Sequence, residues 1–140
     1  MRTFRLAIVE NDEDERFFMS EAFRASGEFE ILGEFGNGDQ LTEWLQGSPR
    51  DLPELVLSDL NMPGKNGYDI IDELKITYPD IAVFATSTSS VLSTREKCIQ
   101  AGATDFIAKP DIFIAYESFV AEFYQLACRY LASGSSSHSP

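Results

Sequence analysis

Short apolar runs alternate with longer segments whose apolar residues recur at helical spacing through most of the chain. The runs have the length of buried strands, and we predict strands at residues 4–9, 30–35, 54–58, 81–86 and 104–108. The second run mixes polar with apolar residues, which is typical of an edge strand. The pattern therefore predicts a regular alternation of strand and helix.

Five helical segments follow the five runs. The first is marked by a stripe that includes Phe18, Ala22 and Phe23, and the last runs from about Ile112 to Leu131. Glycine or proline follows each of the first four segments. Such an alternation requires right-handed βαβ crossovers and a parallel sheet covered on both faces. We therefore predict an α/β fold, a flavodoxin-like (βα)5 three-layer sandwich whose parallel five-stranded sheet has the order 2-1-3-4-5.

The length of 140 residues suits one domain, and 44% of the residues are apolar, which is enough to form its core. We expect a single domain over residues 1–132. The remaining residues, 133–140, are rich in serine and are expected to form a disordered tail.

The chain carries 23 acidic and 11 basic residues, a formal net charge of −12. Nucleic acids and anionic membranes repel such a protein, so neither is expected as its main partner. No apolar run approaches the roughly 20 residues that span a bilayer, and the N-terminus lacks the apolar region of a signal peptide, so we expect a cytoplasmic protein. The one histidine, His138, lies in the predicted tail, which excludes a histidine-based site within the fold.

Polar side chains gather where the predicted strands end. The third run stops at Asp59, and the first stops at Glu10-Asn11-Asp12. Ser87 and Lys109 follow the fourth and fifth runs. Open α/β sheets bind ligands at the carboxyl ends of their strands, so we expect these side chains to meet at one edge.

These residue types suit phosphoryl transfer. Crowded carboxylates repel one another unless a cation lies among them, and oxygen ligands suit Mg²⁺. The chain has no Gly-rich phosphate loop, so a single phosphoryl group is a better candidate than a nucleotide. Asp59 can attack phosphorus to form an aspartyl phosphate, while Lys109 and Ser87 bind the transferred oxygens. An isolated Asp59 could merely begin a turn, but its two companions favour the site role.

The acidic segment Asp12-Glu13-Asp14-Glu15 has a second explanation. Negative charge is favourable at a helix N-terminus, with Asp12 as the N-cap and Glu15 completing a capping box. For the last three residues of the segment we prefer this explanation. Glu10 directly follows the strand and is assigned to the site.

The chain resembles the receiver domains of bacterial two-component response regulators, especially stand-alone receivers such as the chemotaxis regulator. The resemblance extends from Arg5 to about Leu131. Four segments at the strand ends carry it, namely Val9-Glu10-Asn11-Asp12, Ser58 to Gly67, Ser87-Thr88 and Lys109-Pro110.

The resemblance implies a role for each matching residue. It makes Asp59 the phosphoacceptor, Lys109 the lysine that binds the phosphoryl group and Ser87 the switch hydroxyl. Phe106 corresponds to the aromatic residue that reorients on activation. The family's Lys-Pro peptide is usually cis, so we expect a cis bond at Lys109–Pro110.

The implied cofactor is Mg²⁺, with candidate ligands Glu10, Asn11, Asp12, Asp59 and Asn61. Glu10 is the first member of an acidic pair and holds metal-bound water, and Asn61 contributes its backbone carbonyl. The second member is normally a metal-binding aspartate, but here it is Asn11. Its amide oxygen brings no charge, so we expect weaker metal binding and slower transfer. Alternatively, the loop shifts and Asp12 fills this position.

The resemblance implies a receiver that accepts a phosphoryl group onto Asp59 from a sensor histidine kinase or a histidine phosphotransfer protein. This is self-modification followed by slow loss of the group to water, rather than turnover of a free substrate. The signal is expected to reach a downstream protein target through the fourth helix, fifth strand and fifth helix, and homodimers are common in the family. Two alternatives stay open: a pseudo-receiver that docks proteins and is not phosphorylated because of Asn11, and a flavin-binding flavodoxin-like protein.

Overall fold

Five parallel strands form one sheet in the order β2-β1-β3-β4-β5. The computed structural model describes residues 2–88, 92–110 and 115–132. The strands are β1 (Phe4–Val9), β2 (Phe29–Phe35), β3 (Leu55–Asp59), β4 (Ala82–Ser87) and β5 (Asp105–Ala108). The helices are α1 (Glu13–Ser26), α2 (Gly38–Gln46), α3 (Gly67–Thr77), α4 (Leu92–Ala101) and α5 (Tyr116–Ala127), and a π-helical turn, η2 (Cys128–Ala132), follows α5. The predicted fold class and strand order are confirmed.

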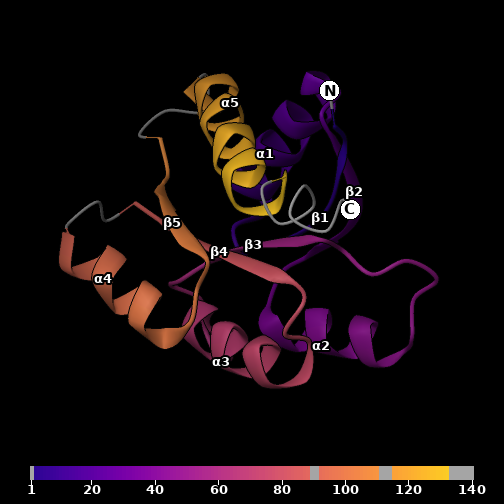
Figure 1. The fold of residues 1–140 in the computed structure, drawn as a ribbon, viewed down its shortest axis with the longest axis vertical. Coiled ribbons are helices and arrows are strands. Elements are labelled where there is room, and N and C mark those ends of the chain that lie inside the picture. The colour runs from indigo at the N-terminus through magenta and orange to yellow at the C-terminus, as the bar shows by residue number, and fades with distance from the viewer. Residues whose placement is uncertain (1, 89–91, 111–114, 133–140) are drawn as a thin grey trace, which may run out of the picture.

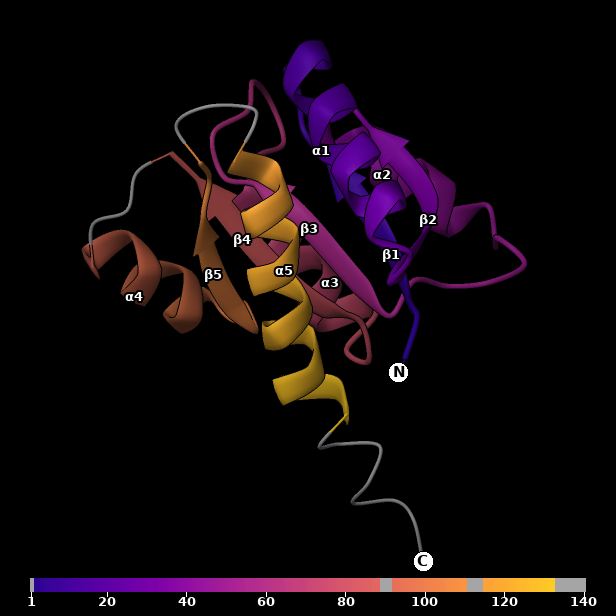
Figure 2. The ribbon, with the colours of Figure 1, turned by 90° about the horizontal axis from the view of Figure 1, so that it is seen from above.

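Helices cover both faces of the sheet, with α1 and α5 on one face and α2, α3 and α4 on the other (Figures 1 and 2). Alternate residues of a strand point to opposite faces. In β1, Leu6 and Ile8 therefore pack in the core beneath α1 and α5, whereas Ala7 and Val9 pack in the opposite core. Burial on both faces explains why the central strands are continuous apolar runs.

Phe123 of α5 is the centre of an aromatic cluster on the first of these faces. Its ring centroid lies 5.6 Å from that of Phe23, 5.6 Å from that of Phe29 and 5.0 Å from that of Phe84. All four rings are buried. The cluster joins α1, β2, β4 and α5, and so fixes α5 against the sheet.

The remaining expectations about the fold have different outcomes. The cis bond expected at Lys109–Pro110 is wrong, because no peptide bond among the described residues is cis. The trans form is the lower-energy isomer of an X–Pro bond, and the fold accommodates it here.

The expected helix start at Ile112 and the tail at 133–140 lie outside the described residues. Within the described part of the chain, no helix is long and apolar enough to cross a membrane.

The turn after β3 depends on the absence of a side chain at Gly67. A Cβ atom at this position would lie 2.6 Å from the carbonyl oxygen of Asp59 and 2.8 Å from the Cα of Leu60. Both are backbone atoms, so they can move only together with the end of β3. Gly67 thus lets α3 begin directly against the strand end that carries Asp59.

Replacing Gly67 by alanine is expected to destabilise the protein by about 1–3 kcal/mol, because the new methyl group must displace this backbone. Gly36→Ala is the matched control, since the nearest atoms to a Cβ there are side-chain atoms at 3.4 Å and 3.7 Å. We expect the control to change stability by less than about 0.5 kcal/mol. Urea unfolding followed by Trp44 fluorescence measures both variants. Equal losses in the two variants would contradict the proposed contact.

Candidate functional site

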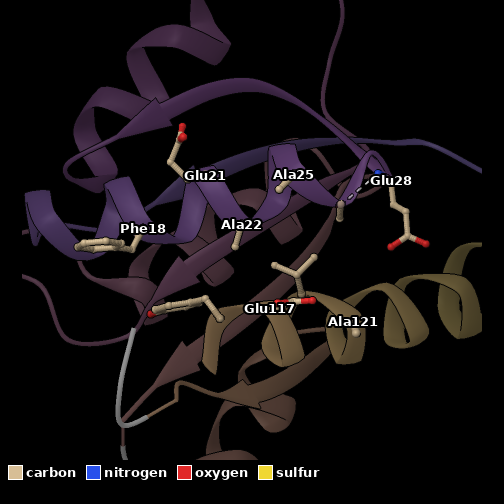
Figure 3. Close-up of a pocket in the computed structure, with 10 residues that line it drawn as sticks. Phe18, Glu21, Ala22, Ala25, Glu28, Glu117 and Ala121 are labelled. Atoms are coloured by element: carbon tan, nitrogen blue, oxygen red, sulfur yellow. Dashed lines mark hydrogen bonds between the residues drawn. The ribbon is translucent and has the colours of Figure 1, made fainter. Parts of the chain in front are cut away.

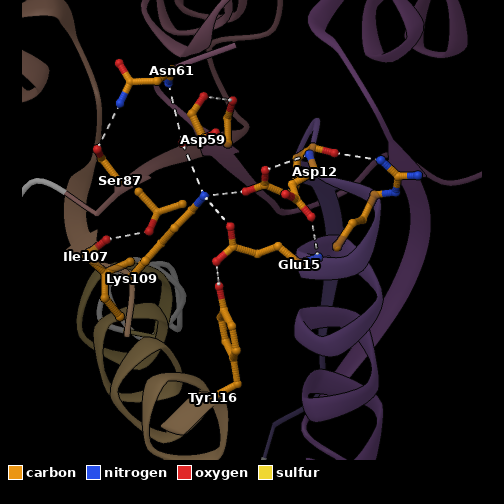
Figure 4. A network of polar contacts seen from close by, with 12 residues as sticks. Asp12, Glu15, Asp59, Asn61, Ser87, Ile107, Lys109 and Tyr116 are labelled. Atoms are coloured by element: carbon orange, nitrogen blue, oxygen red, sulfur yellow. Dashed lines mark hydrogen bonds and ion pairs between the residues drawn. The ribbon is translucent and has the colours of Figure 1, made fainter. Parts of the chain in front are cut away.

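Four strands of the sheet deliver polar side chains to one edge. Asp59 and Ser87 are the last residues of β3 and β4, while Glu10 and Lys109 directly follow β1 and β5. All four residues are buried. The structure therefore brings these four residues to one edge of the sheet, where Figure 4 labels Asp59, Ser87 and Lys109.

The Lys109 ammonium group contacts three carboxylates at this edge. Its Nζ atom lies 2.5 Å from Glu10 Oε1, 3.1 Å from Glu15 Oε1 and 3.4 Å from Asp59 Oδ1. The lysine side chain is only 4% exposed, so these carboxylates replace the water that a charged amine would otherwise bind.

The environment shifts the pKa values of the central groups. Burial raises the pKa of Asp59, although the Lys109 charge acts in the opposite direction. Burial also raises the pKa of Glu10, and the Asp59 charge adds to this effect. For Lys109, burial favours the neutral amine, but the hydrogen bond to Glu10 and the surrounding carboxylates outweigh it and raise the pKa. The ammonium form of Lys109 is thus the stable one at this edge.

Asn61 links the carboxylate side of the edge to the hydroxyl side. Its backbone N–H donates to Asp59 Oδ1 at 3.4 Å, and its side-chain amide donates to Ser87 Oγ at 3.1 Å. Phe106, the other predicted switch residue, is buried in the core beneath α2, α3 and α4. Ser87 therefore lies in β4 and Phe106 in β5, and these two strands are hydrogen-bonded neighbours.

The site's donor atoms suit a hard divalent cation. The carboxylates of Glu10, Glu15 and Asp59 face a single ammonium, which leaves two negative charges unbalanced when all three are ionised. Oxygen atoms of Glu10 and Asp59, together with the Asn61 carbonyl, match the ligands that Mg²⁺ prefers. Among the described residues, no group of three or more His, Cys, Asp or Glu is arranged to hold a metal.

Asn11 and Asp12 lie at the exposed rim of the edge. Asp12 is the N-cap of α1, and its Oδ1 accepts a hydrogen bond from the Glu15 N–H at 2.9 Å. Its own backbone N–H donates to Glu10 Oε2 at 3.0 Å. The predicted N-cap is confirmed, whereas the roles of both residues as metal ligands stay predictions.

Glu15 belongs to the site, although the sequence pattern alone did not predict it. Its predicted place in a capping box is wrong, because Glu10 already accepts from the Asp12 N–H that Glu15 would need. The Glu15 carboxylate instead contacts Lys109 through one oxygen and accepts a hydrogen bond from the Tyr116 hydroxyl, at 2.6 Å, through the other. Burial, followed by this hydrogen bond, raises the pKa of Tyr116 well above its usual value. No local sequence signal pairs α1 with α5 in this way.

A separate groove of about 710 Å³ lies between α1 and α5 (Figure 3). Its walls combine small residues, such as Ala22 and Ala121, with the acidic side chains of Glu21 and Glu117. Tyr116 also lines this groove. The tyrosine therefore lies between the groove and the Lys109 network.

Comparison with known proteins places the chain in a family. Residues 6–113 match the response regulator receiver domain. The chemotaxis protein CheY of Thermotoga maritima is 31% identical over 107 residues, which cover 76% of this chain and 85% of CheY. A cyclic di-GMP phosphodiesterase of the same organism is 31% identical over 103 residues, covering 74% of this chain but 26% of the relative. The chain also spans under a third of the length of MalR of Bacillus subtilis and of NtrC of Azospirillum brasilense.

Solved structures show the same fold. The phosphorylated cyanobacterial phytochrome response regulator RcpA superposes with a TM-score of 0.75 at 20% identity, over 94% of this chain and 96% of RcpA. The receiver domain of NarL from Mycobacterium tuberculosis gives a TM-score of 0.72 at 21% identity, over 89% and 98% of the two chains. The family match, together with the strand order, shows that the chain belongs to the response regulator receiver domains of two-component signalling.

Proposed function

We propose that this receiver accepts a phosphoryl group from a phosphohistidine donor onto Asp59 in an Mg²⁺-dependent reaction. The observation that carries the proposal is the position of the Lys109 ammonium, 3.4 Å from the Asp59 carboxylate at the shared strand edge. A buried lysine beside a buried aspartate supplies a nucleophile and a cation for the transferred oxygens. The donor is a histidine kinase or a histidine phosphotransfer protein.

In the transfer step, one Asp59 carboxylate oxygen attacks the phosphorus atom. A P–O bond forms as the P–N bond of the donor breaks, and the donor imidazole leaves with the electron pair and takes up a proton. Lys109 binds the oxygens of the transferred group as a point charge. Glu10, Asp59 and the Asn61 carbonyl would hold Mg²⁺, whose charge would screen the negative charges of the nucleophile and the phosphoryl group.

The modified residue then acts through its neighbours. The Ser87 hydroxyl accepts a hydrogen bond from the Asn61 amide, and its own O–H can turn to donate to a phosphoryl oxygen. Such a change would reach β5 and Phe106 through the β4–β5 pairing and favour one of two arrangements of the surface formed by α4, β5 and α5. A downstream protein recognises this surface until water hydrolyses the acyl phosphate.

Incubation with acetyl phosphate and Mg²⁺ is expected to add the mass of one phosphoryl group, in a form stable to acid and labile to base. Asp59→Asn should abolish the adduct, because the nucleophilic oxygen is lost. Asp14→Asn, which removes an exposed carboxylate from the first turn of α1, is the matched control and should retain it. Mass spectrometry of the intact protein measures all three. Absence of any adduct on the wild type would favour the pseudo-receiver alternative.

Asn11→Asp is expected to tighten Mg²⁺ binding by at least about fivefold, because a charged oxygen replaces a neutral one at the rim of the site. Asn37→Asp serves as the control. It adds the same charge at the N-cap of α2, where aspartate and asparagine cap equally well. Isothermal titration calorimetry measures the affinities. An equal gain in the two variants would show that only the overall charge matters.

A further inference from the structure

Lys109 lies closer to Glu10 and Glu15 than to Asp59. Since Glu15 belongs to α1 and Glu10 lies between β1 and α1, we call this the α1 side of the lysine. Its ammonium carries three hydrogens, and three carboxylates surround it. Glu10 and Glu15 lie at 2.5 Å and 3.1 Å, whereas Asp59 lies at 3.4 Å. The contact on the side where the phosphoryl group would be attached is thus the longest of the three.

Tyr116 holds Glu15 in this position. The tyrosine is 1% exposed, and its hydroxyl donates to Glu15 Oε2 at 2.6 Å while Glu15 Oε1 faces Lys109. Tyr116 begins α5, and Phe119 packs against its ring with centroids 5.2 Å apart. A buried hydroxyl without an acceptor is unfavourable, so the tyrosine keeps the carboxylate turned towards the site.

We propose that Glu15, fixed by the Tyr116 hydroxyl, is a positioning residue that retains the Lys109 ammonium on the α1 side and thereby slows phosphoryl transfer to Asp59. This inference rests on the proposed function. An incoming phosphoryl group must share Lys109 with Glu15, and its own negative charge is repelled by that carboxylate. Glu15 therefore opposes the modified state without touching the reacting atoms.

Glu15→Gln is expected to raise the initial rate of phosphorylation by acetyl phosphate at least about threefold, because it removes one negative charge near the reacting group and keeps the side-chain shape. Glu13→Gln removes the same charge from an exposed position in the same helical turn and should leave the rate unchanged. A rate for Glu15→Gln that is equal to or below that of the wild type would overturn the proposal. So would an equal increase in both variants.

A double-mutant cycle separates positioning from a general effect on the fold. Tyr116→Phe keeps the buried ring and should give a smaller increase, since Glu15 is then charged but no longer held. In the Glu15→Gln background the same change should have no further effect, because the tyrosine acts through Glu15. Equal effects of Tyr116→Phe on the phosphorylation rate in the two backgrounds would contradict the inference that the tyrosine acts through Glu15.

The Lys109 contact can also be measured without phosphorylation. In the ¹⁵N-labelled protein, a slowly exchanging lysine ammonium signal should be present and should disappear in Lys109→Gln. Glu15→Gln should shift this signal and speed its hydrogen exchange, whereas Glu13→Gln should not. An unshifted signal would overturn the inference even if Asp59 is phosphorylated. A shifted signal in a protein that acetyl phosphate never modifies would support the contact and count against the proposed function.

Discussion

A single buried ammonium group organises the carboxyl edge of this sheet. Lys109 brings a positive charge out of water, and such a charge is stable only when it is paired. Its three partners come from three different parts of the fold, namely Glu10 after β1, Glu15 in α1 and Asp59 at the end of β3. The position of one amine therefore depends on the sheet order and on the packing of α1. Any chemistry at Asp59 has to begin from this arrangement.

Two apolar cores hold the strand ends at their places. The register of β3 against β4 pairs Asp59 with Thr86, and that of β4 against β5 pairs Ser87 with Ala108. Thr86 adds a second link between β4 and β5, since its hydroxyl donates to the carbonyl of Ile107 at 2.6 Å. The strand ends thus position Asp59 and Ser87, whereas the contact between α1 and α5 positions Glu15 beside Lys109. In the proposed function, the same division separates the residues of the transfer step from the residue that slows it.

The residues that meet at the strand ends could be predicted from the sequence, whereas the contacts between α1 and α5 could not. Apolar runs predict strands wherever they occur, and parallel topology then brings Glu10, Asp59, Ser87 and Lys109 to one edge without further information. Glu15 was not predicted as a site residue because a negative charge in the first turn of a helix is favourable by itself, and this local explanation was adequate. The contact that decides its role is made by the packing of α1 against α5, which no short motif encodes. The trans Lys109–Pro110 bond likewise depends on tertiary context rather than on the dipeptide.

A crystal structure with beryllium fluoride and Mg²⁺ would show whether Asp59 and Lys109 bind one phosphoryl group together, since beryllofluoride stands in for that group. We expect this group to be bonded to an Asp59 carboxylate oxygen, with the Lys109 amine in contact with a fluoride and a cation beside Glu10 and the Asn61 carbonyl. An unmodified Asp59 at saturating ligand, with Lys109 still bound only by its carboxylates, would contradict this expectation.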